Sequence, residues 1–184
     1  MRIIAGEHRG RKIKQPKIDI TRPTKDRVRE AVFNIIAMDV PGANFLDLFS
    51  GSGAFGLEAL SRGAKKAVFV ENNFECSKII RENINSMNLE ENTTVMVEDV
   101  YKSIEYLAEE RQRFDLIFAD PPYNTNIVKK LLIIIYQYDI VSSTGFLILE
   151  HHKNEDIPGF PGDVSLYKQR TYGKTIISVF KKNE

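Results

Sequence analysis

The chain contains 184 residues, of which 42% are apolar and 28% charged, and its formal net charge is +1. This length suits one domain with a sizeable core, residues 1–184, and is too short for two comfortable ones. The longest apolar run, residues 131–135, is far too short to cross a membrane, and the single cysteine, Cys76, excludes an internal disulfide. We therefore expect a soluble cytoplasmic protein without a membrane partner.

Positive charge is concentrated in the first 29 residues, which hold ten Lys or Arg and three Asp or Glu, a net charge of +7 that leaves −6 for the rest of the chain. Such a basic arm is typical of nucleic acid binding, although a solvated terminus has the same composition. Apolar residues alternate around Gly6 and Gly10, which predicts a hairpin. Thr24 then caps a helix expected over residues 24–38, so that residues 1–40 form an extension.

Two arginines, Arg27 and Arg29, fall near the amino end of this helix. Cations at that end oppose the helix dipole, which indicates a use other than stability. Contact with a phosphate is one such use. An ion-paired surface with Asp26 and Glu30 is the alternative.

From residue 41 onward, expected strands and helices alternate, which is typical of a doubly wound, mostly parallel sheet in a Rossmann-like α/β fold. The last two strand-like runs are joined by residues 172–174 alone and predict an antiparallel hairpin at the edge of the sheet. The expected strands are residues 45–49, 67–71, 94–98, 114–119, 145–150, 164–171 and 175–180, and the expected helices are residues 54–62, 73–88, 100–110 and 126–138.

A glycine-rich turn joins the first strand of this region to its helix. Gly51, Gly53 and Gly56 form a complete G-x-G-x-x-G, which lets the chain turn tightly and lets a ligand approach the helix amino terminus. Glu71 ends the next strand, where a carboxylate can accept bonds from both ribose hydroxyls. These features predict a site for an adenosine-containing cofactor without saying which one.

Two further carboxylates favour one cofactor. Asp99 and the backbone of Val100 follow the third strand, where they can meet the edge of an adenine. Asp47 ends the first strand and would repel a pyrophosphate but attract a sulfonium and an ammonium, so S-adenosylmethionine fits better than NAD. The alternative stays open that Glu71 and Asp99 are residues at ordinary helix amino termini.

The stretch Asp120-Pro121-Pro122-Tyr123 follows the buried strand at residues 114–119. The prolines end the strand and stiffen the backbone, leaving carbonyls free to accept bonds from a ligand. Asp120 adds an acceptor-only carboxylate, and Tyr123 adds a flat face for a base. This combination suits the exocyclic amino group of a nucleobase. Alternatively, the prolines merely end a strand and Asp120 caps the next helix.

These motifs resemble those of class I S-adenosylmethionine-dependent methyltransferases that act on amino groups. The opening segment, with residues 2–6, 8–11 and 22–30, is similar to the bacterial family that methylates N2 of guanine 966 in 16S ribosomal RNA. The resemblance implies a seven-stranded sheet and a monomer. It also implies a base flipped into the site, S-adenosylhomocysteine as product and no metal. The implied partner is 16S rRNA or the small ribosomal subunit.

The family's functional positions carry over to matching residues of this chain. The resemblance implies cofactor contacts from Asp47, Phe49, Ser50, Gly51, Gly53, Glu71, Asn72, Asp99, Val100 and Asp120. The implied catalytic group is Asp120, Pro121, Pro122 and Tyr123. The implied RNA contacts are Arg9, Arg11, Lys12, Arg22, Thr24 and Arg27.

Other functions stay open at this point. The same acceptor-Pro-Pro-aromatic chemistry serves amino methyltransferases acting on another RNA or on DNA adenine or cytosine. The glycine loop also occurs in NAD-binding oxidoreductases, and a non-catalytic RNA-binding module is possible. Cys76 is expected in a helix away from the cleft, which argues against cysteine-dependent methylation of a base carbon. His151 and His152 are expected at the rim of the fifth strand.

Overall fold

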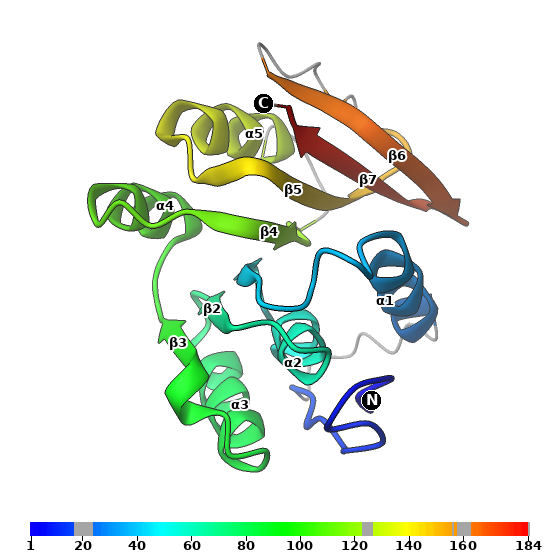
Figure 1. Cartoon of the computed structure of the whole chain (residues 1–184), viewed down its shortest axis with the longest axis vertical. Helices are drawn as coiled ribbons and strands as arrows, with labels where there is room; N and C mark the ends of the chain where they lie inside the picture. The colour runs from blue at the N-terminus through cyan, green and yellow to red at the C-terminus, as the bar shows by residue number, and fades with distance from the viewer. Residues whose placement is uncertain (17–23, 123–126, 156, 158–162, 184) are drawn as a thin grey trace.

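A seven-stranded sheet organises the chain (Figure 1). The structure, a computed structural model, describes residues 1–16, 24–122, 127–155, 157 and 163–183. β7 runs antiparallel to both of its neighbours, and the other neighbouring pairs are parallel. In spatial order the strands are β3 (Thr93–Met96), β2 (Lys66–Val70), β1 (Asn44–Leu48), β4 (Phe114–Ala119), β5 (Val141–His152), β7 (Thr175–Lys182) and β6 (Val164–Tyr172).

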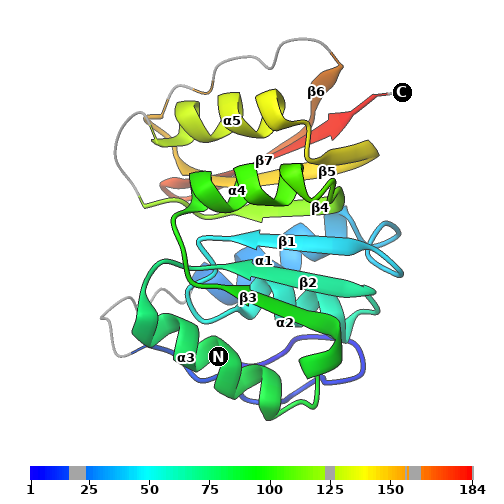
Figure 2. The same ribbon diagram turned by 90° about the vertical axis from the view of Figure 1, so that its left-hand side faces the viewer.

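Helices cover both faces of this sheet. α1 (Thr24–Ile35), α2 (Ala54–Ser61) and α3 (Phe74–Asn85) pack into one apolar core, and α4 (Val100–Glu109) and α5 (Ile127–Tyr138) pack into a second. Figures 1 and 2 show α1 and α2 on the opposite side of the sheet from α4 and α5. None of the helices in the described parts of the chain is long and apolar enough to cross a membrane.

The doubly wound sheet and its C-terminal hairpin confirm the expected fold class, with two differences at element ends. β5 begins at Val141, four residues earlier than predicted, because Val141 pairs with Phe114 of β4 and the polar residues before Gly145 fall within the register shift that follows this pair. Thr144 there has a φ of 66°, an irregularity that composition does not reveal. α1 ends at Ile35, three residues early, where a turn closed by the Asp39 amide and the Ile36 carbonyl replaces it.

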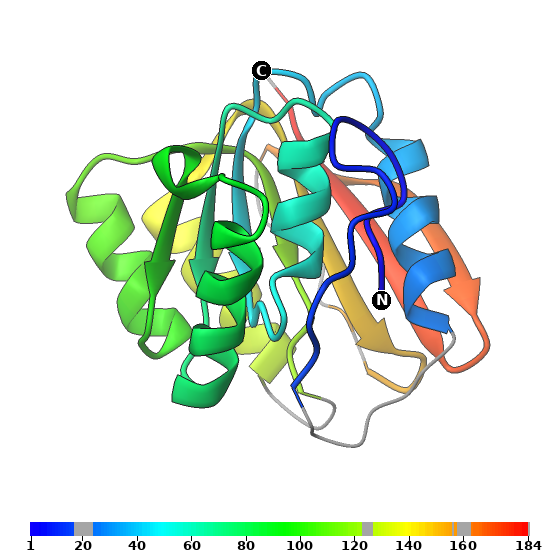
Figure 3. The ribbon, with the colours of Figure 1, turned by 90° about the horizontal axis from the view of Figure 1, so that it is seen from below.

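The first 16 residues form a hairpin that lies against α2 (Figure 3). Its arms meet in a single antiparallel bridge between Arg2 and Lys12, so the predicted hairpin exists as a closed loop more than as a ladder. Ile3 and Ile13, 2% and 3% exposed, belong to the same apolar core as α1 and α2. Burial of these two side chains holds the hairpin on the body of the protein.

Candidate active site at the carboxyl ends of the strands

A cavity opens at the carboxyl ends of β1 and β4, the place in the strand order where open α/β sheets bind ligands. Its empty space, open mouth included, is about 890 Å³. The glycine loop and Asp120, predicted separately as cofactor and catalytic elements, both reach it. It is lined by Asp47, Phe49, Ser50, Gly51, Ser52, Ala54 and Phe55 from β1 to α2, by Phe118 in β4 and Asp120 after it, and by Met1, Gln15, Pro16, Arg29, Cys76 and Glu150.

The glycine loop has a backbone that requires glycine at specific positions. Gly51 and Gly53 have φ of 57° and 77°. A side chain on Gly56 would come within 2.3 Å of the Phe69 ring, so α2 approaches β2 this closely only without one. Phe49, at the cavity, also has a positive φ of 58°, a conformation rare outside glycine.

Glu71 fastens this loop from the end of β2. Its Oε2 accepts a hydrogen bond from the Gly51 N–H at 2.8 Å, and its Oε1 accepts one from the Asn73 N–H at 2.8 Å. Asn73 in turn caps α3, accepting from the amides of Glu75 and Cys76. The carboxylate therefore joins the glycine loop to the start of α3. Glu71 and the exposed Asn72 are not among the cavity's lining residues.

Asp99 caps α4, as the helix-cap alternative predicted. Its Oδ1 accepts from the amides of Tyr101 at 3.0 Å and Lys102 at 3.4 Å. Asp99 is exposed and Val100 is buried, and both lie outside the cavity, along the same edge of the sheet. A contact of these residues with an adenine stays a prediction, and it would have to extend past Glu71 toward β3.

Asp47 is a buried carboxylate behind the glycine loop. It is 1% exposed, and its Oδ2 accepts the Gly56 N–H at 2.9 Å. Burial raises the pKa of Asp47 well above its usual value, and repulsion from Asp120 and Glu71 adds to that rise. A cation in the cavity would relieve this repulsion. Ser50 stabilises the turn after β1, because its Oγ donates to the Asp47 carbonyl at 2.6 Å.

Asp120 lies at the cavity directly after β4 and is partly exposed. Pro121 is buried and Pro122 exposed. Behind Asp120, the Phe118 ring stacks on the Phe55 ring with a centroid distance of 3.5 Å, which gives the cavity an aromatic wall. The predicted stacking residue, Tyr123, lies outside the described residues.

The hairpin is fixed to α2 through one buried carboxylate, Glu58, which is 0% exposed. Glu58 accepts from the amides of Ile4 at 2.8 Å and Ala5 at 3.0 Å, and it pairs with Arg62 at 2.7 Å and Arg29 at 3.5 Å. These contacts place the hairpin and the first helix around the same carboxylate.

Gly6 continues this attachment at the end of α2. A Cβ there would fall 1.7 Å from the Ser61 carbonyl oxygen, so backbone contacts backbone directly. The Glu7 amide donates to that carbonyl, and the His8 amide donates to the Ser61 hydroxyl at 3.0 Å.

At the other end of the hairpin, Asn83 of α3 joins it to the glycine loop. Asn83 is 1% exposed, accepts from the Lys14 amide at 2.8 Å, and donates to the carbonyls of Lys14 and Ser52. Gln15 also donates to the Ser52 hydroxyl at 3.1 Å. The hairpin is thus hydrogen-bonded to the loop that borders the cavity.

Comparison with known proteins decides the family. Residues 1–181 match the model of the family described as Conserved hypothetical protein 95. The chain is 36% identical over 182 residues to the "Putative rRNA methyltransferase YlbH" of Bacillus subtilis, covering 99% of both. It is 30% identical over 182 residues to the Ribosomal RNA small subunit methyltransferase D of Escherichia coli, covering 99% of this chain and 90% of that protein. The chain belongs to this methyltransferase D family.

A solved structure of the Escherichia coli protein yhhF has the same architecture. Its TM-score is 0.88 at 27% sequence identity, and the match covers 100% of this chain and 98% of that one. The family resemblance seen in the motifs is therefore confirmed over the hairpin, the sheet and the C-terminal strands.

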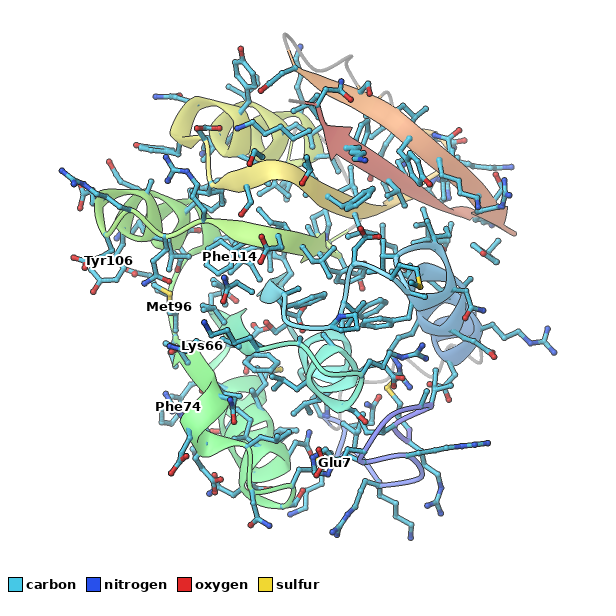
Figure 4. All side chains as sticks on the ribbon, viewed as in Figure 1. Glu7, Lys66, Phe74, Met96, Tyr106 and Phe114 are labelled. Carbon is cyan, nitrogen blue, oxygen red and sulfur yellow. The ribbon has the colours of Figure 1, made fainter. Side chains whose placement is uncertain are left out.

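In this member of the methyltransferase D family, the basic residues predicted to bind RNA fall in two places. Arg9, Arg11 and Lys12 are exposed on the hairpin, next to the turn that packs on Ser61, the last residue of α2. Because α2 begins at the glycine loop, that turn lies at the far end of the helix from the cavity, and Figure 3 shows the loop of the hairpin beside that end of α2. Figure 4 labels Glu7 in the same segment.

Arg27 lies in the other place. It is exposed on α1, two residues before Arg29, which lines the cavity. Arg22 and the side chain of Thr24 lie outside what the structure describes.

Arg29 is the main departure from the sequence-based expectation. Both earlier interpretations placed it on the surface, whereas its side chain is 0% exposed. It donates to the Arg2 carbonyl at 2.6 Å and to Asp26 at 3.2 Å, and burial lowers the pKa of its guanidinium. Asp26 was a predicted ion-pair partner. Glu58 was not, although a carboxylate within the apolar helix sequence of α2 is the signal that marks it.

Two further expectations were wrong. Cys76, in the first turn of α3, lines the cavity, because Glu71 joins the start of α3 to the glycine loop. Burial raises the pKa of the Cys76 thiol, so its thiolate is disfavoured. His151, expected at the rim, is 2% exposed and contacts Ser178 on β7 at 2.9 Å, because β7 pairs with β5 along this stretch of the sheet.

Proposed function

We propose that this chain transfers a methyl group from S-adenosylmethionine to the exocyclic N2 amino group of a guanine in 16S rRNA, of the guanine 966 type, and releases S-adenosylhomocysteine. The observation that carries the proposal is the shared cavity: the glycine loop and Asp120 line the same space at the carboxyl ends of β1 and β4. A methyl donor held at the loop would face an amine held by Asp120. The family's rRNA methyltransferase names support the RNA substrate.

The residues at the cavity fit S-adenosylmethionine, which when bound supplies an electrophilic methyl group on a sulfonium. Asp47, Asp120 and Glu150 place three carboxylates at the cavity against one guanidinium, that of Arg29. Burial is the main cause of the raised pKa of Asp47, and repulsion from Asp120 and Glu71 adds to it, so a further cation in the cavity would be stabilised. A pyrophosphate would add further negative charge, which argues against NAD. In the proposal Glu71 holds the ribose hydroxyls, and Asp99 with the Val100 amide holds the adenine.

At the substrate side, the guanine N2 is a poor nucleophile because its lone pair is delocalised into the ring. In the proposal, the Asp120 carboxylate and the Pro121 carbonyl each accept one of the two N2–H bonds. The nitrogen can then pyramidalise and direct its lone pair at the methyl carbon, and it loses one proton as the new C–N bond forms. Positioning and electrostatics carry most of this catalysis. Tyr123 would stack on the flipped base, worth about 1–3 kcal/mol.

The decisive experiment incubates the protein with isotope-labelled S-adenosylmethionine and small ribosomal subunits that lack their methylations. Digestion and nucleoside mass spectrometry then identify the product. We expect label in N2-methylguanosine alone, with naked 16S rRNA as a parallel substrate to separate RNA from subunit recognition. Label in a methylated adenine or cytosine, or no transfer to either substrate, would contradict the proposal.

Cofactor affinity should depend on pH through Asp47. In the free protein the pKa of Asp47 is raised, and a bound sulfonium and ammonium would favour the ionised form and lower that pKa. Binding would then release a proton, so affinity should rise with pH between the pKa of the complex and that of the free protein. Calorimetry between about pH 5 and 7, below the usual range of the cofactor's own α-amino group, measures it.

Asp47→Asn is the matched control for this prediction. The amide keeps an oxygen for the Gly56 N–H but cannot ionise. Proton release should therefore disappear in this variant. Equal proton release by both proteins would assign the effect to another group.

RNA binding should depend differently on the two groups of basic residues. Replacing Arg27 by alanine should weaken binding and reduce the slope of log affinity against log salt by about 0.7–0.9, one phosphate contact. A triple alanine variant at Arg9, Arg11 and Lys12 tests whether RNA reaches the far end of α2 as well. Filter binding across a salt series compares the variants, and an unchanged slope in both would leave the arm without a phosphate contact.

A further inference from the structure

Glu150 is a cavity carboxylate that the motifs do not include. It lies in β5, the strand beside β4, and its neighbour Leu149 pairs in parallel register with Ala119, the residue before Asp120. Asp120 and Glu150 therefore come directly after a paired position on two neighbouring parallel strands. Glu150 is 5% exposed and lines the same cavity as Asp120. Its carboxylate is therefore an acceptor placed beside Asp120 at the cavity.

The proposed substrate has one more donor than the proposed mechanism uses. The Watson–Crick edge of guanine presents three N–H bonds, two on N2 and one on N1. Asp120 and the Pro121 carbonyl account for the two on N2. The N1–H is left, and a donor buried without an acceptor would weaken binding severely.

The other cavity residues do not serve this donor well. Asp47 already accepts from the Gly56 amide and lies behind the glycine loop. Phe55 and Phe118 present aromatic carbon. Arg29 carries only donors, and its positive charge offsets part of the negative charge of the carboxylates in the same cavity.

We propose that Glu150 accepts the N1–H of the target guanine and thereby selects guanine over the other bases. This inference rests on the proposed function, because it assumes a guanine held by its N2 at Asp120. It predicts discrimination: adenine and cytosine present a ring acceptor at the corresponding position, which would face the carboxylate and be repelled. Glu150 is thus a specificity residue at the substrate edge.

The test compares guanine with 2-aminopurine at the target nucleotide of reconstituted small subunits. 2-Aminopurine keeps the 2-amino group, has a lone pair in place of the N1–H and lacks the 6-oxygen, so the change in preference between the wild-type protein and the Glu150 variants reports on the contact at N1. We expect the wild-type protein to prefer guanine by about 10- to 100-fold in kcat/KM. Glu150→Gln can donate to the lone pair or accept the N1–H, so its preference should fall to a few fold. Glu150→Ala should lose turnover on guanine without gaining it on 2-aminopurine.

Three outcomes separate the possibilities. A wild-type protein that methylates both bases equally overturns the role of Glu150, whatever the variants do. A Glu150→Gln protein that turns over guanine with the wild-type preference overturns it as well. A wild-type protein that methylates no guanine N2 refutes the proposed function instead. Affinity for S-adenosylmethionine, measured in the absence of RNA, should stay within a few fold of the wild-type value in both variants, which shows that they are folded.

Discussion

Replacing Asp120 by alanine is expected to lower methyl transfer by about a thousandfold or more while leaving S-adenosylmethionine affinity within a few fold of the wild-type value. Asp120 stands at the cavity immediately after β4 and is the carboxylate that accepts from the substrate amine in the proposed mechanism. Its loss removes an acceptor whose interaction strengthens as positive charge develops on N2. The cofactor keeps its contacts at the glycine loop, which this substitution leaves intact.

Single-turnover transfer with saturating cofactor and RNA measures the chemical step, and equilibrium calorimetry measures cofactor affinity. Asp120→Asn is the matched control, because the amide retains one acceptor oxygen and should lose less activity than alanine. Removing Asp120 also removes one of the charges that raise the pKa of Asp47, so the pH dependence of cofactor binding should shift to lower pH. Wild-type turnover in Asp120→Ala would refute the assigned role.

Replacing Glu58 by alanine is expected to lower the free energy of unfolding by about 3–5 kcal/mol. This buried carboxylate accepts from the amides of Ile4 and Ala5 and pairs with Arg29 and Arg62. Alanine would leave the Arg29 guanidinium, itself 0% exposed, without its main counter-charge. It would also release the start of the hairpin from α2.

Urea denaturation of wild-type and variant proteins measures this difference. Glu82→Ala is the matched control, because Glu82 pairs with Lys14 at 2.9 Å with both side chains more than half exposed. Such a surface pair is worth about 0–1 kcal/mol. If both variants lose equally little stability, Glu58 does not anchor the hairpin.

Local patterns were enough to predict most of the fold. Strand-like runs alternating with amphipathic helices predicted the doubly wound sheet, and the short connection at Gly173 predicted the final hairpin, since each signal lies within a dozen residues. The start of β5 was missed because Val141 pairs with Phe114 of β4 ahead of an irregular polar stretch that does not read as a strand. Tertiary pairing overrides local propensity at such a position.

The candidate site was predictable where its residues belong to motifs and unpredictable where they meet only in space. Asp47, Gly51 and Asp120 follow successive strand ends, and parallel strands bring such ends to one edge. Glu150 belongs to no motif, and Arg29 belongs to one that does not reveal its burial, which depends on Glu58 and Arg2 far away in the chain. Likewise, nothing local shows that the turn beside Arg9 lies at the far end of α2.

Asn83 couples the motions of the N-terminal hairpin and the glycine loop. Its amide group holds the Lys14 backbone on one side and the Ser52 carbonyl on the other, so neither segment can loosen without disturbing the other. Solvent exchange of the Lys14 amide proton should therefore slow when a ligand occupies the loop, even though Lys14 itself is exposed. That proton is a natural reporter for occupancy of the cavity.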